Sequence, residues 1–357
     1  MVKSPQSDVD RALEAYHSGN LGTAERLLKK LLRRNPVQAD CRHLLGLIAF
    51  QHGYFKNAAR QIDQAVAIEP ENPTFCCNLG AALLEAGATR EAIANYEKAI
   101  ALRPRYPQAL ANLGLAYARI DELAKAEEAH RAAIEIVPED AAVHFNLANF
   151  LAASGRDDEA IDAYGDALRH NRNYVEAHSN LASIFRGPGD FTRALQHLDE
   201  AERQNSGNFV LQYNLASTLQ QAGRLALARD RYLIARDIAP DSIDVRINLA
   251  AVLVDLARPG EAIELLRECC EARPDDASLR ASLASLLEQV NQLPEAREHL
   301  RMGLEQAPSD GTLRLLDARF RRRGGDIAAS RDMLLTLLTE SLPPEIEAKV
   351  AIELGVI

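Results

Sequence analysis

Prolines recur along this chain at a fixed interval, and that interval limits the folds that the chain can adopt. The first four members of the series are 34 residues apart, and the next gap is three times that length. The series is Pro36, Pro70, Pro104, Pro138, Pro240, Pro274 and Pro308. A fixed period of this size indicates stacked copies of one supersecondary unit. With proline at position 32, nine units follow without an insertion: 5–38, 39–72, 73–106, 107–140, 141–174, 175–208, 209–242, 243–276 and 277–310.

Several positions of this unit have the side-chain sizes that two closely packed helices need. Position 7 is leucine and position 8 is glycine or alanine in units two to nine, and position 20 is alanine in all nine units. Position 24 is mostly large, as in Ile62, Tyr96 and Leu198. Helices approach closely where small residues meet at the crossing point with large residues beside them. Each unit is therefore predicted to be an antiparallel helix pair with positions 8 and 20 in contact.

The turn residues agree with this prediction. Position 15 is glycine in six units, and Asp121 and Asn291 occupy it in two others. A helix often ends at a left-handed residue, which is usually glycine and sometimes Asn or Asp. Pro259 and Pro294 fall in the first turn of the second helix, which tolerates proline. Asn72, directly before a proline, is predicted to cap a first helix.

Composition favours helices and argues against several classes of protein. Aromatic residues make up 5% of the chain and tryptophan is absent, whereas strands draw on aromatic and β-branched residues. The net charge of −10 argues against a nucleic-acid-binding surface. No run approaches the 18 apolar residues of a membrane helix, the N-terminus has no apolar stretch typical of a signal peptide, and five cysteines do not suggest a disulfide framework. We therefore expect a cytoplasmic protein that neither binds nucleic acid nor inserts into a membrane.

The period and the residues at these positions resemble the tetratricopeptide repeat (TPR) family over residues 5–310. The resemblance continues more weakly over 311–344, a degenerate unit in which Asp317 replaces the leucine and Ser330 the alanine. It implies an all-α fold, an α-solenoid in which antiparallel helix pairs stack into a right-handed superhelix. Such repeats bind protein partners and carry no chemistry of their own.

The resemblance also implies how the whole chain is organised. We expect residues 1–357 to form a single solenoid. Residues 345–357 resemble another first helix with a Leu354-Gly355 pair. This segment is predicted to be either a capping helix or the start of a further unit.

Asparagine occupies position 6 in six consecutive units. We call Asn78, Asn112, Asn146, Asn180, Asn214 and Asn248 the asparagine column. Position 6 lies about 200° from position 8 on a helix, so it is predicted to face the concave groove, with positions 2, 9 and 13 beside it. Asparagine in mid-helix costs up to about 0.7 kcal/mol relative to alanine. Six such penalties on one face require an explanation.

The asparagine column has two interpretations. The repeats were duplicated from one ancestor that carried asparagine, or these side chains bond only to each other, and in either case no ligand is involved. Alternatively, each amide offers a donor and an acceptor that match one peptide unit of a ligand. The column resembles the asparagine ladder in the TPR region of O-GlcNAc transferase, where such residues hold the backbone of protein substrates. That resemblance implies that the column and Asn149, at position 9, bind an extended peptide.

No set of residues forms a recognisable catalytic or metal site. The sequence has no CxxC, HExxH or phosphate-binding loop, so we expect no enzymatic activity and no cofactor or metal. Cys269 is predicted to be a small core residue and Cys77 to lie at the groove rim. His144 and His178, at position 4 of successive units, are expected to make ordinary surface contacts. The basic cluster Arg319–Arg323 is either a solvated helix face or a docking patch for an acidic partner.

Two functions are consistent with these observations. The first is a protein–protein interaction scaffold that binds extended peptide segments in the groove. The absence of lysine at groove positions in the central units argues against a carboxylate clamp. The alternative is the N-terminal substrate-recruiting arm of a larger glycosyltransferase or sulfotransferase, because similar bacterial arrays precede such domains. The expected partner is a protein or peptide in an extended conformation, and a homo-oligomer is left open.

Overall fold

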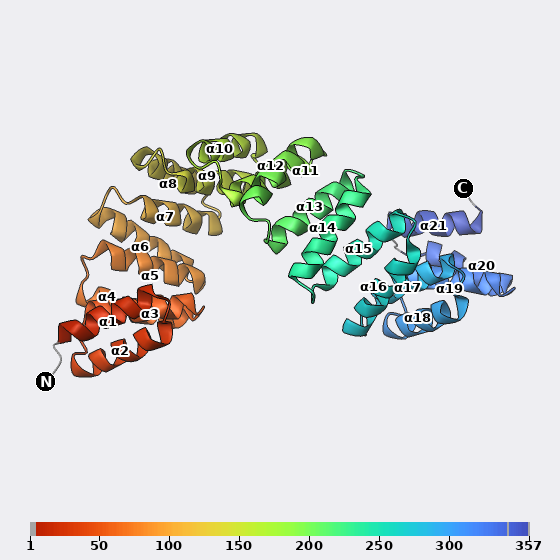
Figure 1. The fold of residues 1–357 in the computed structure, drawn as a ribbon, viewed down its shortest axis with the longest axis horizontal. Helices are drawn as coiled ribbons and strands as arrows, with labels where there is room; N and C mark the ends of the chain where they lie inside the picture. The colour runs from red at the N-terminus through yellow and green to blue at the C-terminus, as the bar shows by residue number, and fades with distance from the viewer. Residues whose placement is uncertain (1–4, 341–342, 356–357) are drawn as a thin grey trace. The chain divides into compact units, whose positions relative to one another are not determined.

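The computed structural model describes residues 5–340 and 343–355, and these ranges contain 21 helices and no strand (Figure 1). The first helices of the pairs are α1 (Pro5–His17), α3 (Ala39–Gln51), α5 (Pro73–Glu85), α7 (Pro107–Arg119), α9 (Ala141–Ala153), α11 (Val175–Arg186), α13 (Phe209–Gln221), α15 (Ile243–Asp255), α17 (Ala277–Gln289), α19 (Gly311–Arg323) and α21 (Pro344–Leu354). The second helices are α2 (Leu21–Arg34), α4 (Phe55–Ile68), α6 (Thr89–Leu102), α8 (Leu123–Ile136), α10 (Asp157–His170), α12 (Phe191–Gln204), α14 (Leu225–Ile238), α16 (Pro259–Ala272), α18 (Leu293–Gln306) and α20 (Ile327–Leu338). The helices alternate in the order that the predicted antiparallel pairs require.

The chain divides into two compact units, residues 1–177 and 178–357, and the division falls within α11. Within each unit, a second helix packs on the first helix of its own pair and on the first helix of the next pair, as α4 packs on α3 and α5. First helices also contact each other, as α5 contacts α7 and α13 contacts α15. Each unit is therefore a two-layered helical stack, which confirms the predicted all-α solenoid. The single continuous solenoid and its superhelical hand remain predictions.

Position 8 is small because positions 20 and 24 of the facing helix lie against it, as where a Cβ added at Gly46 would lie 3.1 Å from the carbonyl oxygen of Ala58. At Gly80 in α5, an added Cβ would lie 2.7 Å from Cε1 of Tyr96 in α6. At Gly114 in α7, it would lie 2.6 Å from Nε2 of His130 in α8. Ala92 of α6, at position 20 of its repeat unit, is completely buried. The large position-24 side chains thus fill the space that glycine or alanine leaves on the facing helix.

The turn between the two helices of a pair depends on one left-handed residue. The glycines at position 15 have φ between 70° and 86°, as in Gly223 and Gly87. Asp121 and Asn291 both have φ 63°, which confirms the predicted substitutes. Ala257 takes the same conformation with φ 57°, which the sequence did not lead us to expect. A left-handed L-residue with a Cβ costs roughly 1–2 kcal/mol, so this turn is strained relative to the others.

Proline and asparagine begin helices where the sequence predicts. The side chain of Asn72 accepts hydrogen bonds from the backbone N–H groups of Thr74 (3.1 Å) and Phe75 (3.3 Å). Pro259 and Pro294 lie in the first turns of α16 and α18. The predicted N-cap and helix starts are therefore confirmed.

The last described helix, α21, packs on α19 and α20. Its Val350 is fully buried in a cluster with Leu334 and Leu337 of α20. The Leu354-Gly355 pair marks the end of this helix: α21 ends at Leu354, and Gly355 follows as a left-handed cap with φ 72°. The capping helix and the start of a further unit both stay predictions for residues 345–357.

Among residues 5–340 and 343–355, none of the helices combines the length and the apolar character that crossing a bilayer requires.

Candidate functional site

The asparagine column lies on the surface of the first-helix layer. Its six side chains are half-buried, whereas the position-7 leucines that follow them are buried, as in Leu79 (4% exposed) and Leu249 (1%). Asn78, Asn112 and Asn146 belong to the first compact unit, and the other three to the second. We call positions 2, 6, 9 and 13 of the first helices the first-helix face. Its central amides are accessible to solvent on one side and fixed by packing on the other.

Two members of the column use their amide N–H groups within the chain. Nδ2 of Asn78 lies 2.8 Å from Nε2 of His43, and Nδ2 of Asn248 donates to the hydroxyl of Tyr213 at 2.8 Å. Burial lowers the pKa of His43 to about 4, so its ring is neutral at pH 7 and Nε2 can accept the hydrogen bond. His43 and Tyr213 both occupy position 5 of the preceding first helix. The column is therefore bonded to the neighbouring repeat at these points, and its members do not bond only to each other.

Asn112 is also engaged, through its oxygen. Oδ1 of Asn112 accepts a hydrogen bond from Nε2 of Gln108 at 3.1 Å. Cys77 stands at position 5 of the preceding first helix, and burial raises the pKa of its thiol while the nearby side chains of Tyr106 and Asn112 lower it.

Asn146 and Asn214 differ from these three. Within the part of the chain that the structure describes, neither amide side chain makes a hydrogen bond, and Ala111 at position 5 before Asn146 offers no polar group. Asn149 lies on the same face, where its Oδ1 accepts a hydrogen bond from the buried hydroxyl of Tyr164 at 2.5 Å. Beside Asn146, the half-buried ring of Phe145 adds apolar surface to this part of the face.

One ion pair on the first-helix face joins two neighbouring first helices. Arg119 in α7 forms an ion pair with Glu85 in α5 at 2.7 Å and donates to the carbonyl oxygen of Leu84 at 2.8 Å. Both side chains occupy position 13 of their units. The face between them therefore offers a ligand amide groups and small side chains more than free charge.

The basic cluster Arg319–Arg323 is neutralised within the chain. Arg319 lies 2.9 Å from the carboxylate of Glu288, which is 2% exposed, and Arg323 lies 3.4 Å from the same group. Arg322 pairs with Glu353 of α21 at 2.6 Å. Arg321 pairs with Asp317 at 3.0 Å. These ion pairs join α17, α19 and α21, so the structure does not support an acidic-partner docking patch here.

The remaining candidates from the sequence have structural roles. Cys269 is fully buried, as predicted. Cys77 is 1% exposed, so its predicted place at the groove rim is wrong; the next repeat covers it. The rings of His144 and His178 each pack on a histidine of the same helix pair. In the described ranges, no three His, Cys, Asp or Glu side chains are placed to hold a metal ion.

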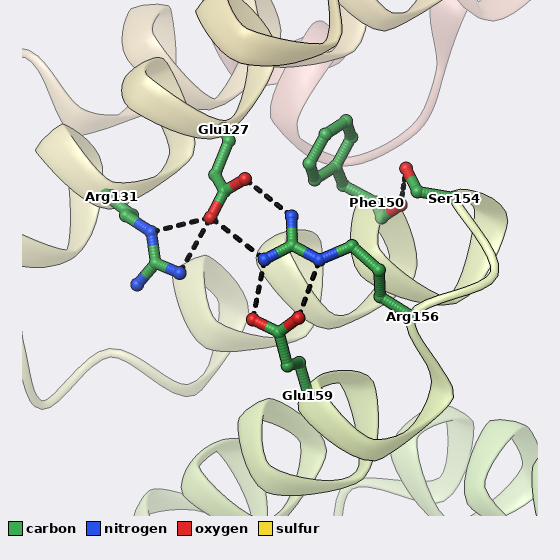
Figure 2. Close-up of polar contacts among 6 residues, drawn as sticks. All are labelled: Glu127, Arg131, Phe150, Ser154, Arg156 and Glu159. Atoms are coloured by element: carbon green, nitrogen blue, oxygen red, sulfur yellow. Dashed lines mark hydrogen bonds and ion pairs between the residues drawn. The ribbon is translucent and has the colours of Figure 1, made fainter.

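The second-helix layer carries ion-pair networks, one of which is drawn in Figure 2. Arg156, at the start of α10, lies 2.6 Å from Glu127 of α8 and 2.5 Å from Glu159 of α10. Glu127 also accepts from Arg131 at 2.7 Å. In the second unit, Arg267 of α16 pairs with a glutamate of α18 at 2.8 Å. These networks link neighbouring second helices.

Hollows in the structure also lie at the second-helix layer. One of about 650 Å³ is lined by residues of α4, α5 and α6, and another of about 440 Å³ by residues of α14, α15 and α16. No member of the asparagine column lines either of them.

Comparison with protein families identifies the repeat. A "TPR repeat" family matches residues 82–121. Two further "Tetratricopeptide repeat" families match 121–184 with 253–320, and 9–73 with 179–243. Together these matches cover most of the chain. It is a tetratricopeptide repeat protein. TPR proteins act in general as non-catalytic scaffolds for protein interactions, and this family membership supports such a role here.

Solved TPR structures share the fold. The C-terminal part of a TPR repeat-containing protein from Cytophaga hutchinsonii is 16% identical with a TM-score of 0.58, over 66% of this chain and 96% of that one. A tetratricopeptide repeat protein from Parabacteroides merdae ATCC 43184 is 17% identical with a TM-score of 0.55, over 70% of this chain and 98% of that one. At this identity the likeness concerns the fold alone. A search of curated proteins finds none that matches.

The TPR register shows what the sequence analysis missed on this face. His43 and Tyr213 were not singled out, although each lies 35 residues before an asparagine of the column. That spacing is one repeat plus one residue, so position 5 of one unit approaches position 6 of the next. A search for polar residues at this separation would have found both partners.

Proposed function

We propose that this TPR protein is a scaffold that binds an extended protein segment along its first-helix face. The asparagine column and Asn149 are the proposed binding residues. The observation that carries the proposal is a half-buried amide at position 6 of six consecutive first helices; at Asn146 and Asn214 neither polar atom bonds to a described residue. An amide in this state can donate to one peptide carbonyl and accept from one peptide N–H.

The dimensions of a TPR stack suit this use. Packed helices lie 8–10 Å apart, and an extended peptide advances roughly 3.3–3.6 Å per residue. Successive asparagines within one unit would therefore meet about every third ligand residue. Because the amides contact the backbone, the ligand's side chains have a smaller part in recognition.

The charge pattern of the face supports the same kind of ligand. Arg119 and Glu85 neutralise each other, so no free cation on this part of the face competes to bind a carboxylate. Recognition through neutral amides predicts an affinity that changes little with salt, because screening acts on exposed charges. A cytoplasmic location and an extended ligand conformation are parts of this proposal.

A binding experiment with a defined peptide pool tests the proposal. A displayed library of random 16-residue peptides is selected on the full chain, and the affinity of a selected peptide is measured. Replacing Asn112, Asn146, Asn180 and Asn214 together by alanine should weaken binding by about 3 kcal/mol, roughly a hundredfold, since each hydrogen bond contributes about 0.5–1.5 kcal/mol. Helicity should be unchanged or higher, because alanine is the better helix former.

The matched control replaces two asparagines of the second-helix layer. Asn57 in α4 and Asn95 in α6 lie outside the first-helix face, and each forms a hydrogen bond within its own helix. The variant with Asn57→Ala and Asn95→Ala should bind the selected peptide like the unaltered chain. If the fourfold variant binds equally well, the column is a remnant of repeat duplication and the proposed function is wrong.

A further inference from the structure

Two second helices of the first compact unit carry opposite charge. They are α2 and α10, which belong to the first and the fifth helix pairs (Figure 1). Helix α2 has five Lys or Arg side chains and one glutamate, whereas α10 has five Asp or Glu side chains and one arginine. The whole chain has a net charge of −10, so the charge of α2 is opposite in sign to that of the chain.

On each of these helices, three of the charged side chains form a stripe. The basic stripe of α2 consists of Arg26, Lys30 and Arg34. The acidic stripe of α10 consists of Asp158, Asp162 and Asp166. Five of the six side chains are exposed and Asp166 is half-buried. Members four residues apart lie on one side of a helix, so the two stripes have opposite charge and identical spacing.

The helix dipole explains only the ends of the stripes. Acidic residues in a first turn and basic residues in a last turn stabilise a helix, which accounts for Asp158 and Arg34. The effect of the dipole falls off beyond the terminal turn. Arg26 and Asp162 both lie at position 22 of their units, in the interior of the helix. The dipole therefore does not explain why their charges are opposite.

The two stripes do not neutralise each other within one chain. Helix α2 packs on α1 and α3, and α10 packs on α9. Packed helices lie about 8–10 Å apart, so a separation of four repeats exceeds the Debye length of about 10 Å at 0.1 M salt. Asp166 pairs with Arg169 of its own helix, but Arg26 and Asp162 form no ion pair with any residue of 5–340 or 343–355. Both stripes can therefore attract a surface of another molecule.

We propose that copies of this chain associate head to tail, with the basic stripe of one copy against the acidic stripe of the next. When the two helices run antiparallel, equal spacing brings all three members of one stripe opposite the three of the other. This orientation also places the C-terminal end of α2 beside the N-terminal end of α10, where the helix dipoles attract each other. The second copy is the occupant because it carries the complementary charge at the required spacing.

The contact has a consequence for how the copies assemble. It joins two different surfaces, so each contact leaves one stripe free on either copy, and association can continue into a ring or an open chain. The stripes lie on second helices, so the first-helix face of every copy stays accessible. This inference does not depend on the proposed function.

Sedimentation velocity of the full chain over a range of concentrations tests the proposal. At low salt, the average sedimentation coefficient should rise with protein concentration. The association should weaken at least about tenfold in about 1 M salt, where the Debye length is about 3 Å. Circular dichroism at both salt concentrations shows that the fold is kept.

Charge reversal of each stripe provides the decisive variants. One variant carries Arg26→Glu, Lys30→Glu and Arg34→Glu. The other carries Asp158→Lys, Asp162→Lys and Asp166→Lys. Each variant alone should remain a monomer, because stripes of like charge then face each other. An equimolar mixture of the two should associate at low salt, because each stripe of one variant then meets an opposite charge on the other.

A matched control changes the net charge equally without altering α10. It replaces exposed acidic residues on second helices of the second compact unit, as Glu271→Lys, Glu298→Lys and Asp332→Lys. This variant should associate like the unaltered chain. If it does not, net charge and not the acidic stripe governs association, and the proposal is wrong.

Other outcomes also overturn the proposal. They are an unaltered chain that stays a monomer at low salt, a single reversed variant that still associates, and a mixture of the two variants that does not. Vesicles of phosphatidylcholine and phosphatidylserine test the other occupant of a basic helix, an anionic membrane. A monomeric chain that binds these vesicles through the basic stripe would assign α2 to a membrane instead of a second copy.

Discussion

Two helix pairs of the first compact unit, α5–α6 and α9–α10, place the same tyrosine at the same position in different surroundings. In α10, the hydroxyl of Tyr164 is buried and donates to Asn149 of α9 at 2.5 Å. In α6, the hydroxyl of Tyr96 is equally buried, but Ala81 stands where Asn149 does and no described group accepts from it. A shared helix register therefore determines where a side chain lies, but not whether its polar atom has a hydrogen-bond partner.

A third helix pair, α7–α8, has a histidine at this position, and it gives the largest expected change in the free energy of unfolding. His130 of α8 replaces the tyrosine, is 1% exposed, and has no hydrogen-bond partner for either ring nitrogen among described residues. Burial lowers its pKa to about 4, against 6.5 when exposed, so the unfolded chain binds this proton first as the pH falls. Stability should drop by about 2 kcal/mol between pH 7 and pH 5 and by about 3 kcal/mol at pH 4.

Urea denaturation across this pH range measures the effect. His130→Leu is the matched control, because Leu198 fills the same position in α12. The leucine variant should lose this part of the acid sensitivity, while the contribution of His43, whose pKa is also lowered, remains. An unchanged pH profile in His130→Leu would contradict the assignment to His130.

Asn149→Ala should remove from α9–α10 the hydrogen bond that α5–α6 lacks. The lost bond from the buried hydroxyl of Tyr164 to Asn149 should lower the free energy of unfolding by about 0.5–1.5 kcal/mol. In a Tyr164→Phe background the same substitution should cost much less, because the donor of that bond is absent. Thermal or urea unfolding of the four chains gives the coupling energy, and a value near zero would show that this hydrogen bond does not matter.

Two turns of the second compact unit also place different residues in the same backbone conformation. Gly223 and Ala257 both follow a first helix with a left-handed backbone, but only Ala257 carries a Cβ there. Ala257→Gly should raise the free energy of unfolding by about 1 kcal/mol, and Gly223→Ala should lower it by a similar amount. Urea unfolding that shows both substitutions to be neutral would mean that these turns bear no strain.

Ala81→Asn should give the hydroxyl of Tyr96 in α5–α6 an acceptor like the one in α9–α10. We expect this substitution to change the free energy of unfolding least. An acceptor for the hydroxyl of Tyr96 contributes about 1 kcal/mol, and the poorer helix propensity of asparagine offsets about half of it. The expected net gain in unfolding free energy is about 0.5 kcal/mol. Ala81→Leu, which offers no acceptor, should show no such gain, and neither should Ala81→Asn in a Tyr96→Phe background.

Most of the fold could be predicted from the sequence because each repeat contacts only its neighbours. The small residues at positions 8 and 20, together with glycine at position 15, define helix pairs whose bounds follow from the 34-residue period alone. Ala257 was missed because the prediction relied on residue types that favour a left-handed backbone. In the structure the hydrogen bonds of the helix end, such as Arg258 N–H to the carbonyl of Leu253, hold the turn in place whatever its side chain.

The sequence predicts which face of the first helices carries the candidate site, but not the hydrogen bonds that its residues form. Helical periodicity shows that the asparagine column is accessible, which the structure confirms. The bonding state of each amide depends on a residue one repeat away, such as His43 for Asn78, which a single helical wheel does not include. Cys77 was misplaced for the same reason, because the next first helix covers position 5. The pairing of Arg322 with Glu353 likewise depends on how α21 packs.

The unbroken 34-residue register has a consequence for how such a chain changes over evolution. Because every internal junction joins the same kinds of residue, unequal recombination can delete or duplicate a whole unit without creating a mismatched interface. Each exchange would also remove or add one member of the asparagine column. An extended ligand segment along the first-helix face would then be shorter or longer by about three residues. The number of units then sets how many residues of an extended segment the first-helix face can span.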